Sequence, residues 1–320
     1  MTSSNTLSTL DNPPVSFGFR RGSWVTVRTL EEILATLDAD GKLEGVLFMP
    51  EMIPFCGRTF RVHRRAERTC VEGVGNRRMD RTVLLEGVRC NGADHDGCER
   101  RCLFFWKDAW LIPADRDAAA SSANTLPIIE KPYLPTTKDD RYYCQSTELA
   151  GATYELTLRN ISCYLHDLMV GETTFRRVCF IVWMGIVNRI LRPVSSHRYF
   201  ERPAGKQKRT TSVELDLKPG ELVEVKSLDE IKQTLDATGR NRGMCFEPEM
   251  GLHCGKRYRV LEPIRKMISE ETGKMVALSN TVLLVGMTCE GICAWNCPRA
   301  NYFFWRECWL KRVEESPSPA

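Results

Sequence analysis

The sequence lacks most of the features that assign a chain to a functional class at first sight. Its polar opening, MTSSNTLSTLDNPP, has no apolar core, so it is not expected to act as a secretory signal. No apolar stretch is long enough to span a bilayer. A phosphate-binding loop, a dinucleotide fingerprint, a metalloprotease helix and a serine–histidine–acid order are also absent. We therefore expect a cytoplasmic protein, and the common enzyme classes have no support.

The chain also lacks a large net charge of either sign. The chain has 45 Lys and Arg residues against 41 Asp and Glu residues, a formal net charge of +4. A dedicated nucleic-acid-binding protein usually carries a denser basic patch. The charge therefore permits a nucleic-acid partner but gives it little support.

Cysteine, in contrast, is abundant, with 14 residues in a chain of 320. Inside a cell, cysteines are more often metal ligands or buried apolar residues than disulfides. The cysteine content therefore directs attention to metal binding.

The chain is an internal duplication. Residues 22–62 align without gaps with residues 220–260, at 20 identical positions of 41. After one inserted residue, 82–111 align with 281–310 at 14 of 30 positions. A repeat of this quality predicts that both copies share one fold.

Each copy predicts a small β-rich unit. It opens with alternating apolar residues, GSWVTVRT and GELVEVKS, which favour a strand. A short amphipathic helix follows, with Thr29 or Ser227 as its N-cap. Further strands are predicted at Phe60–Val62, Thr82–Val88 and Trp110–Pro113, with counterparts in the second copy. The predicted fold class is α+β, mainly β, with two tandem small SH3-like β-barrels joined by a helical segment.

The composition divides the chain into seven parts. A polar N-terminus and a short C-terminal tail flank two β-rich repeats, which are separated by a linker, a helical middle segment and a basic linker. The predicted bounds, in chain order, are 1–18, 19–113 (first repeat), 114–140, 141–194 (helical segment), 195–217, 218–313 (second repeat) and 314–320.

Each repeat has one isolated cysteine and a later cluster of possible metal ligands. The repeat register aligns three members of each set, whereas the remaining member is histidine in one copy and cysteine in the other. Tetrahedral zinc accepts both thiolate and imidazole ligands. We therefore predict two structural zinc ions. One site has three cysteines and one histidine and the other has four cysteines, formed by Cys56, Cys90, His95 and Cys98, and by Cys254, Cys289, Cys293 and Cys297.

Several alternatives stay open for these residues. Iron–sulfur clusters also take cysteine ligands, and the same cysteines could be buried core thiols or redox-active thiols. In the first copy, Cys102 could replace His95, but it aligns with Asn301, so the repeat favours His95. Cys179 and Cys308 stand among apolar neighbours and are predicted to be buried.

Two matched carboxylates, Glu51 and Glu249, lie in the repeated PEM phrase beside the predicted metal ligands. They could form hydrogen bonds to the metal ligands, or act as catalytic bases in a cleft. A local hydrogen-bonding role is the favoured interpretation.

The tryptophans of the final strand region are also matched, Trp106 and Trp110 with Trp305 and Trp309. Packing in the core is the favoured interpretation. The alternative is an aromatic surface that binds a peptide or a nucleic-acid base.

The helical middle segment contains an apolar stretch at 178–187, flanked by arginines between 176 and 192. It is too short to cross a membrane. Packing against a neighbouring domain is favoured, and peripheral membrane contact through 176–192 is the alternative.

The combined pattern of GxxVxV, FxPEM, CG, a cysteine/histidine cluster and WxxxWL, present twice, resembles a family of bacterial proteins that have no assigned activity. The resemblance covers most of the chain, including RYYCQSTEL at 141–149. It is also similar, more generally, to SH3-like domains. The resemblance implies a fold and no particular role.

These observations favour a zinc-binding accessory or binding protein with a protein or small-molecule partner. One alternative is an enzyme with an active site between the repeats or an iron–sulfur cluster. The other is a pair of barrels that bind nucleic acid.

Overall fold

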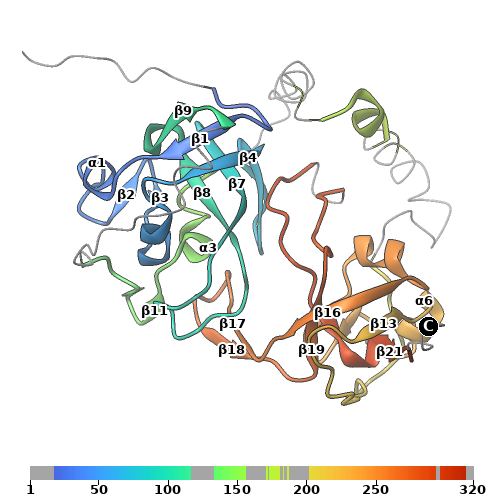
Figure 1. The fold of residues 1–320 in the computed structure, drawn as a ribbon. Helices are drawn as coiled ribbons and strands as arrows, with labels where there is room; N and C mark the ends of the chain where they lie inside the picture. Colours follow the sequence, from blue (N-terminus) through green and yellow to red (C-terminus); the bar gives the residue numbers. More distant parts are fainter. Residues whose placement is uncertain are drawn as a thin grey trace, which may run out of the picture.

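The computed structural model describes residues 18–116, 133–155, 171, 173–180, 183, 186, 202–292 and 296–314. In these residues the protein is mainly β, with antiparallel sheets and few short helices, as predicted. Figure 1 shows the strands gathered in two units, one from each repeat.

The first repeat contains a five-stranded antiparallel sheet in the order β8-β7-β4-β1-β9. Its strands are β1 (Trp24–Val27), β4 (Thr59–Arg65), β7 (Thr82–Arg89), β8 (Leu103–Lys107) and β9 (Leu111–Ala114). Val25 and Val27 of β1 are fully buried, whereas Trp24 and Thr26 are half-buried, as expected when alternate side chains of a strand face the core.

Shorter elements complete this repeat. They are the helix α1 (Leu30–Leu34), the paired strands β2 (Lys42–Leu43) and β3 (Val46–Leu47), the 3-10 helices η1 (Pro50–Phe55) and η2 (Asp108–Trp110), and a hairpin of β5 (Arg68–Val71) and β6 (Gly75–Arg78).

The second repeat has the corresponding sheet order, β20-β19-β16-β13-β21. The two halves therefore share one strand topology. The elements are β13 (Leu222–Val225), α6 (Leu228–Lys232), β14 (Arg240–Asn241), β15 (Met244–Cys245), η5 (Pro248–His253), β16 (Arg257–Pro263), β17 (Lys266–Ile268), β18 (Met275–Ala277), β19 (Thr281–Leu284), β20 (Trp305–Arg306), η6 (Glu307–Trp309) and β21 (Leu310–Arg312).

Both predicted helix N-caps are confirmed. The Thr29 hydroxyl accepts a hydrogen bond from the backbone N–H of Glu32 at 3.3 Å, and the Glu32 carboxylate accepts one from the Thr29 N–H at 2.9 Å. Ser227 and Glu230 repeat this arrangement in α6. These capping boxes satisfy N–H groups that a helix start leaves unpaired.

The four matched tryptophans lie in the hydrophobic cores, and this rules out the exposed aromatic surface. Each is fully buried. Trp110 lies in η2 and not, as the sequence predicted, in the last strand. Its ring faces inward, and Nε1 donates a hydrogen bond to Thr36 Oγ1 at 3.0 Å. Trp309 makes the same contact with Thr234.

The two cysteines predicted to be buried have different outcomes. Cys308 is buried in the core of the second repeat, as predicted. Cys179 is exposed, so that prediction was wrong. It lies in a helical stretch, 175–180, whose large residue Phe175 is also 71% exposed, so apolar neighbours in the sequence do not bury it.

Residues 133–155, which the sequence assigns to a linker and a helical segment, pack onto the first repeat. They form β10 (Thr137–Lys138), β11 (Arg141–Tyr142), α3 (Gln145–Glu148) and β12 (Tyr154–Glu155). The Gln145 amide donates to the carbonyls of Leu47 and Phe105 at 2.7 and 2.9 Å. A buried amide bonded in this way fixes α3 within the core. Most of the predicted segment 176–192 lies outside the described residues.

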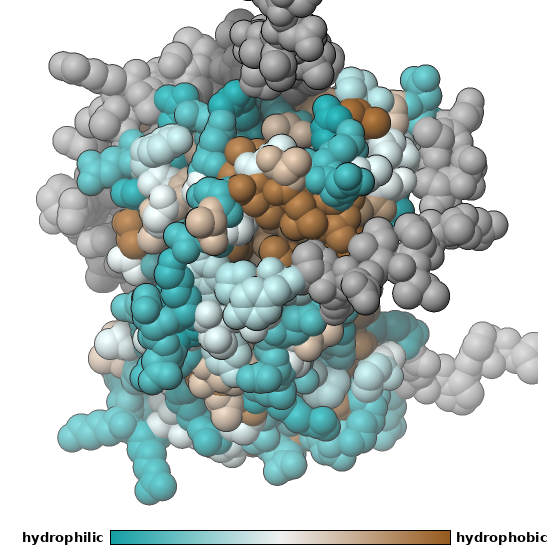
Figure 2. Space-filling view, turned by 90° about the vertical axis from the view of Figure 1, so that its left-hand side faces the viewer, coloured by the Kyte–Doolittle hydropathy of each residue, from teal (hydrophilic) through white to brown (hydrophobic). Residues whose placement is uncertain are grey.

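No helix among the described residues is long and apolar enough to cross a membrane. Figure 2 shows the side of the molecule on which the first repeat lies. This face is largely hydrophilic, with one group of hydrophobic side chains exposed between polar ones.

Candidate functional site

The two repeats meet through a reciprocal contact between hairpins and cysteine loops. The β5–β6 hairpin of the first repeat contacts the loop before β20, where the N–H of Cys70 donates to Cys297 Sγ at 3.2 Å. The β17–β18 hairpin of the second repeat contacts the loop before β8, where the N–H of Ile268 donates to Cys98 Sγ at 3.3 Å. Figure 1 shows β17 and β18 beside the first repeat. Cys98 aligns with Cys297, and Cys70 and Ile268 make the same contact from the two hairpins, so the junction has approximate twofold symmetry.

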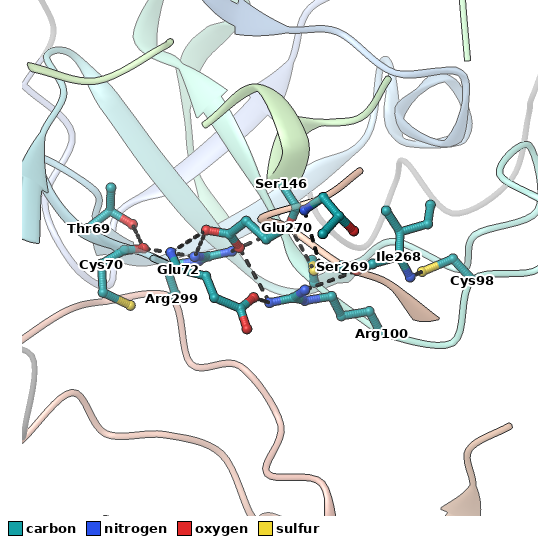
Figure 3. Close-up of polar contacts among 12 residues, drawn as sticks. Thr69, Cys70, Glu72, Cys98, Arg100, Ser146, Ile268, Ser269, Glu270 and Arg299 are labelled. Carbon is teal, nitrogen blue, oxygen red and sulfur yellow. Dashed lines mark hydrogen bonds and ion pairs between the residues drawn. The ribbon is translucent and has the colours of Figure 1, made fainter. Parts of the chain in front are cut away.

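Two arginines extend this symmetry. Arg100 donates to the carbonyl of Ile268 at 3.0 Å, and its counterpart Arg299 donates to the carbonyl of Cys70 at 2.8 Å. Figure 3 shows both guanidinium groups close to the carboxylate of Glu270. Arg299 contacts this carboxylate at 2.7 and 3.0 Å, and Arg100 contacts it at 3.4 Å.

The junction therefore contains a buried excess of positive charge. Arg299 and Glu270 are buried, and the Arg100 side chain is only 11% exposed, whereas the Glu72 side chain that also contacts Arg100 is 52% exposed. Burial acts to raise the pKa of Glu270, but the two guanidinium groups outweigh it and hold this pKa below its ordinary value. Two buried cations thus share one buried carboxylate. The more exposed carboxylate of Glu72, 3.0 Å from Arg100, supplies the second negative charge of this cluster, since buried charges are costly unless paired.

Four cysteines from three chain segments line one small cavity next to Arg100. Cys90 follows β7, Cys98 and Cys102 belong to the loop before β8, and Cys144 precedes α3. The cavity volume is about 30 Å³. Burial raises the pKa of the Cys98 thiol, and it raises the pKa of Cys144 to about 11. Burial therefore favours the protonated thiols of Cys98 and Cys144 over their thiolates.

His95 lines the same cavity, but both of its ring nitrogens have other partners. Nδ1 lies 2.6 Å from a carboxylate oxygen of Glu51, and Nε2 lies 3.0 Å from the carbonyl oxygen of Tyr143. A carbonyl accepts hydrogen bonds only, so Nε2 carries a proton. Burial acts to lower the pKa of His95, but the hydrogen bond and charge of Glu51 raise it above its ordinary value. In this arrangement both ring nitrogens of His95 take part in hydrogen bonds, and Glu51 favours the charged form of the ring.

This buried ion pair predicts a pH dependence of stability. Since the folded-state pKa of His95 is raised, its contribution is fully present below the unfolded pKa of about 6.5 and is lost as pH rises through the folded pKa. We expect Glu51→Gln to lower the melting temperature most near pH 6 and progressively less at alkaline pH. Thermal melts of both proteins from about pH 6 to about pH 10 test this. A deficit that grows with pH contradicts the assignment.

The predicted carboxylates hold the cysteine loops in both repeats. Glu51 accepts a hydrogen bond from the N–H of Asp94 at 3.2 Å, and Glu249 accepts one from the N–H of Glu290 at 2.9 Å. Both carboxylates are buried. The local hydrogen-bonding role that the sequence favours is thus observed, although the two loops are held at different residues.

The predicted ligand sets are brought together in part. Cys90, His95 and Cys98 line one cavity, whereas Cys56 packs against the hydrophobic core of the first repeat, where burial raises its pKa to about 12. In the second repeat, Cys254 and Cys289 pack against the second core. Cys293 lies outside the described residues.

Within the described part of the chain, no group of three or more His, Cys, Asp or Glu side chains is arranged to hold a metal ion. Two cysteines near the predicted ligands were missed, Cys70 and Cys144. Cys144 lies outside both repeats and Cys70 lies outside the aligned ranges, so the repeat pattern gave no signal for them.

Comparisons with family models, with curated proteins and with solved structures find no match to the chain.

Proposed function

We propose that the protein binds structural zinc through the thiolates of Cys90, Cys98, Cys102 and Cys144. In this proposal it is an accessory or binding protein in which the metal fixes the junction between two small SH3-like barrels. The observation that carries the proposal is the meeting of four cysteines from separate segments around one cavity.

The charge at the junction supports this donor set. Four thiolates around one Zn²⁺ ion carry a net charge of about −2, since each thiolate contributes one negative charge. Arg100 lines the cavity, and Arg299 contacts the same Glu270 carboxylate as Arg100 does. A guanidinium group next to the cavity would favour an anionic metal–thiolate centre there.

A four-cysteine centre differs from the set that the repeat pattern favours. His95 contacts Glu51, and Cys56 packs against the core and does not line the cavity. Cys102 and Cys144 take their places in the proposal. The second zinc ion, at Cys254, Cys289, Cys293 and Cys297, stays a prediction from the sequence.

Two observations bear on the choice between zinc and an iron–sulfur cluster, and they point in opposite directions. A cavity of about 30 Å³ suits a single ion better than a cluster of several metal and sulfide ions. The sulfur atoms of the four proposed ligands, however, are not arranged around a common centre as ligands of one ion would be. An iron–sulfur cluster is larger and binds cysteines that lie further apart. We favour zinc because of the cavity size. Binding then draws the four sulfur atoms inward to about 2.3 Å from the ion.

A zinc ion with four protein ligands has no open position for water or substrate, so the proposed centre is structural and not catalytic. A protein or small-molecule partner of the paired barrels remains part of the proposal. Nucleic acid and a membrane surface are weaker candidates, because the charge excess is small.

Elemental analysis and a visible spectrum of the purified protein test the proposal. We expect at least one zinc ion per chain and no absorption band in the visible range. Cys102→Ser should lose one equivalent of zinc, whereas Cys245→Ser, which changes a half-buried cysteine on β15, should lose none.

Two results would contradict this assignment. Finding iron together with a broad visible absorption band would indicate an iron–sulfur cluster at these residues in place of zinc. Finding no metal in protein prepared under reducing conditions without chelators would show that the protein does not bind zinc.

A further inference from the structure

Two cysteines from different repeats are in direct contact at the junction. Cys70 lies on β5 of the first repeat, and Cys297 lies in the loop before β20 of the second. Their sulfur atoms are 3.3 Å apart, and the N–H of Cys70 also donates to Cys297 Sγ at 3.2 Å. A disulfide bond has an S–S length of about 2.05 Å, so a movement of little more than about 1 Å would join them.

The backbone on both sides of this contact is held in place. Arg299 donates to the carbonyl of Cys70 at 2.8 Å, as Figure 3 shows. Arg64 of β4 donates to the carbonyl of Asn296 at 3.0 Å and to that of Cys297 at 3.4 Å. The two thiols are therefore positioned by arginines from both repeats and do not meet through chance contact of mobile side chains.

Packing alone does not require a cysteine at position 70. The equivalent position of the other repeat is Ile268, whose N–H contacts Cys98 Sγ as the N–H of Cys70 contacts Cys297 Sγ. An isoleucine thus fits the same hairpin–loop contact. Of these two similar contacts, only the one between Cys70 and Cys297 brings two thiols together.

We propose that Cys70 and Cys297 form a reversible disulfide that links the two repeats when the protein meets a peroxide. Cys297 gives up its proton and the thiolate attacks one oxygen of hydrogen peroxide; the O–O bond breaks, Cys297 becomes a sulfenic acid, and the departing hydroxide takes up the proton and leaves as water. Cys70 then gives up its proton and attacks the Cys297 sulfur, which forms the S–S bond and releases a second water. Two thiols and one peroxide thus yield one disulfide and two waters.

The link would join the β5–β6 hairpin to the loop before β20 and fix the junction covalently. Cys297 is 2% exposed, so only a small oxidant reaches it without local opening, whereas Cys70 is half-buried. The assignment competes with the sequence prediction that Cys297 is a zinc ligand, because a metal-bound thiolate does not pair with Cys70. It is independent of the cavity at Cys90, Cys98, Cys102 and Cys144.

Peptide mapping of the full-length protein tests this inference. Purified protein is treated with a small excess of hydrogen peroxide, alkylated and digested without reductant, and its zinc content is measured in parallel. We expect a peptide pair linked through Cys70 and Cys297 to be the first disulfide formed and to disappear after reduction. Cys70→Ile, which copies the other repeat and should fold normally, should not form it.

Thermal melts supply the second readout. Oxidation should raise the melting temperature of the unsubstituted protein and leave that of Cys70→Ile unchanged, because a cross-link between distant residues restricts the unfolded chain. The inference is overturned if other thiols oxidise first while this pair stays unlinked. It is also overturned if the pair reacts only after a chelator removes zinc, which would make both residues metal ligands.

Discussion

Cys144→Ser is expected to release one zinc ion per chain and to destabilise the first repeat strongly. Cys144 is buried beside α3 and is the proposed ligand furthest in sequence from the other three. Its loss detaches 133–155 from the metal as well as removing a thiolate. Structural zinc contributes on the order of 10 kcal/mol to the folding of small metal domains. We expect cooperative unfolding of the first repeat at a temperature well below that of the unsubstituted protein.

Metal content and calorimetry of the variant measure both effects. Cys308→Ser is the matched control, because Cys308 is also buried but lies in the core of the second repeat, away from the cavity. It should lose stability through poorer packing and keep its zinc. If Cys144→Ser retains a full complement of metal, Cys144 is not a ligand.

Glu270→Ala is expected to lower the free energy of unfolding by about 3–5 kcal/mol, which is the usual consequence of removing one partner from a buried ion pair. Its side chain is 2% exposed and accepts hydrogen bonds from Arg299 and from the N–H of Glu72. Without it, two buried guanidinium groups of the junction lose their shared carboxylate. Urea denaturation followed by tryptophan fluorescence measures the change.

The control for this experiment is Glu72→Ala. Glu72 contacts Arg100 at 3.0 Å, but its side chain is 52% exposed. We expect a loss below about 1 kcal/mol, as is usual for exposed ion pairs. Equal losses for the two variants would mean that the position of Glu270 between the arginines has no special importance.

The features that the sequence predicts well are local or repeated. The N-caps at Thr29 and Ser227 depend on neighbours three residues away, and both were found where predicted. The shared strand topology follows from the duplication, since two similar sequences adopt similar folds.

The junction could not be predicted in the same way. The contact between Cys70 and Cys297 joins residues from different repeats, and no alignment of the repeats with each other reveals which surfaces meet. The same holds for Gln145, which completes the first core from a segment outside both repeats. The proposed ligand set also departs from the set that the repeat favours, because a contact that the alignment does not reveal joins His95 to Glu51.

Reciprocal contacts hold the two similar halves of the chain together. Each hairpin contacts the cysteine loop of the other half, and each loop sends an arginine back to the opposite hairpin. The cavity of the first repeat and the thiol pair of Cys70 and Cys297 each adjoin one arginine of this cluster, Arg100 and Arg299 respectively. Metal binding and oxidation would therefore act on one shared interface.

X-ray absorption spectroscopy at the zinc edge of the purified protein shows which atoms bind the ion. We expect a first shell of sulfur atoms only, four per zinc at about 2.3 Å, because Cys90, Cys98, Cys102 and Cys144 are the proposed thiolate ligands. A shell that includes an imidazole nitrogen would contradict this ligand set and make His95 a ligand in place of a cysteine. Protein without zinc would contradict it entirely.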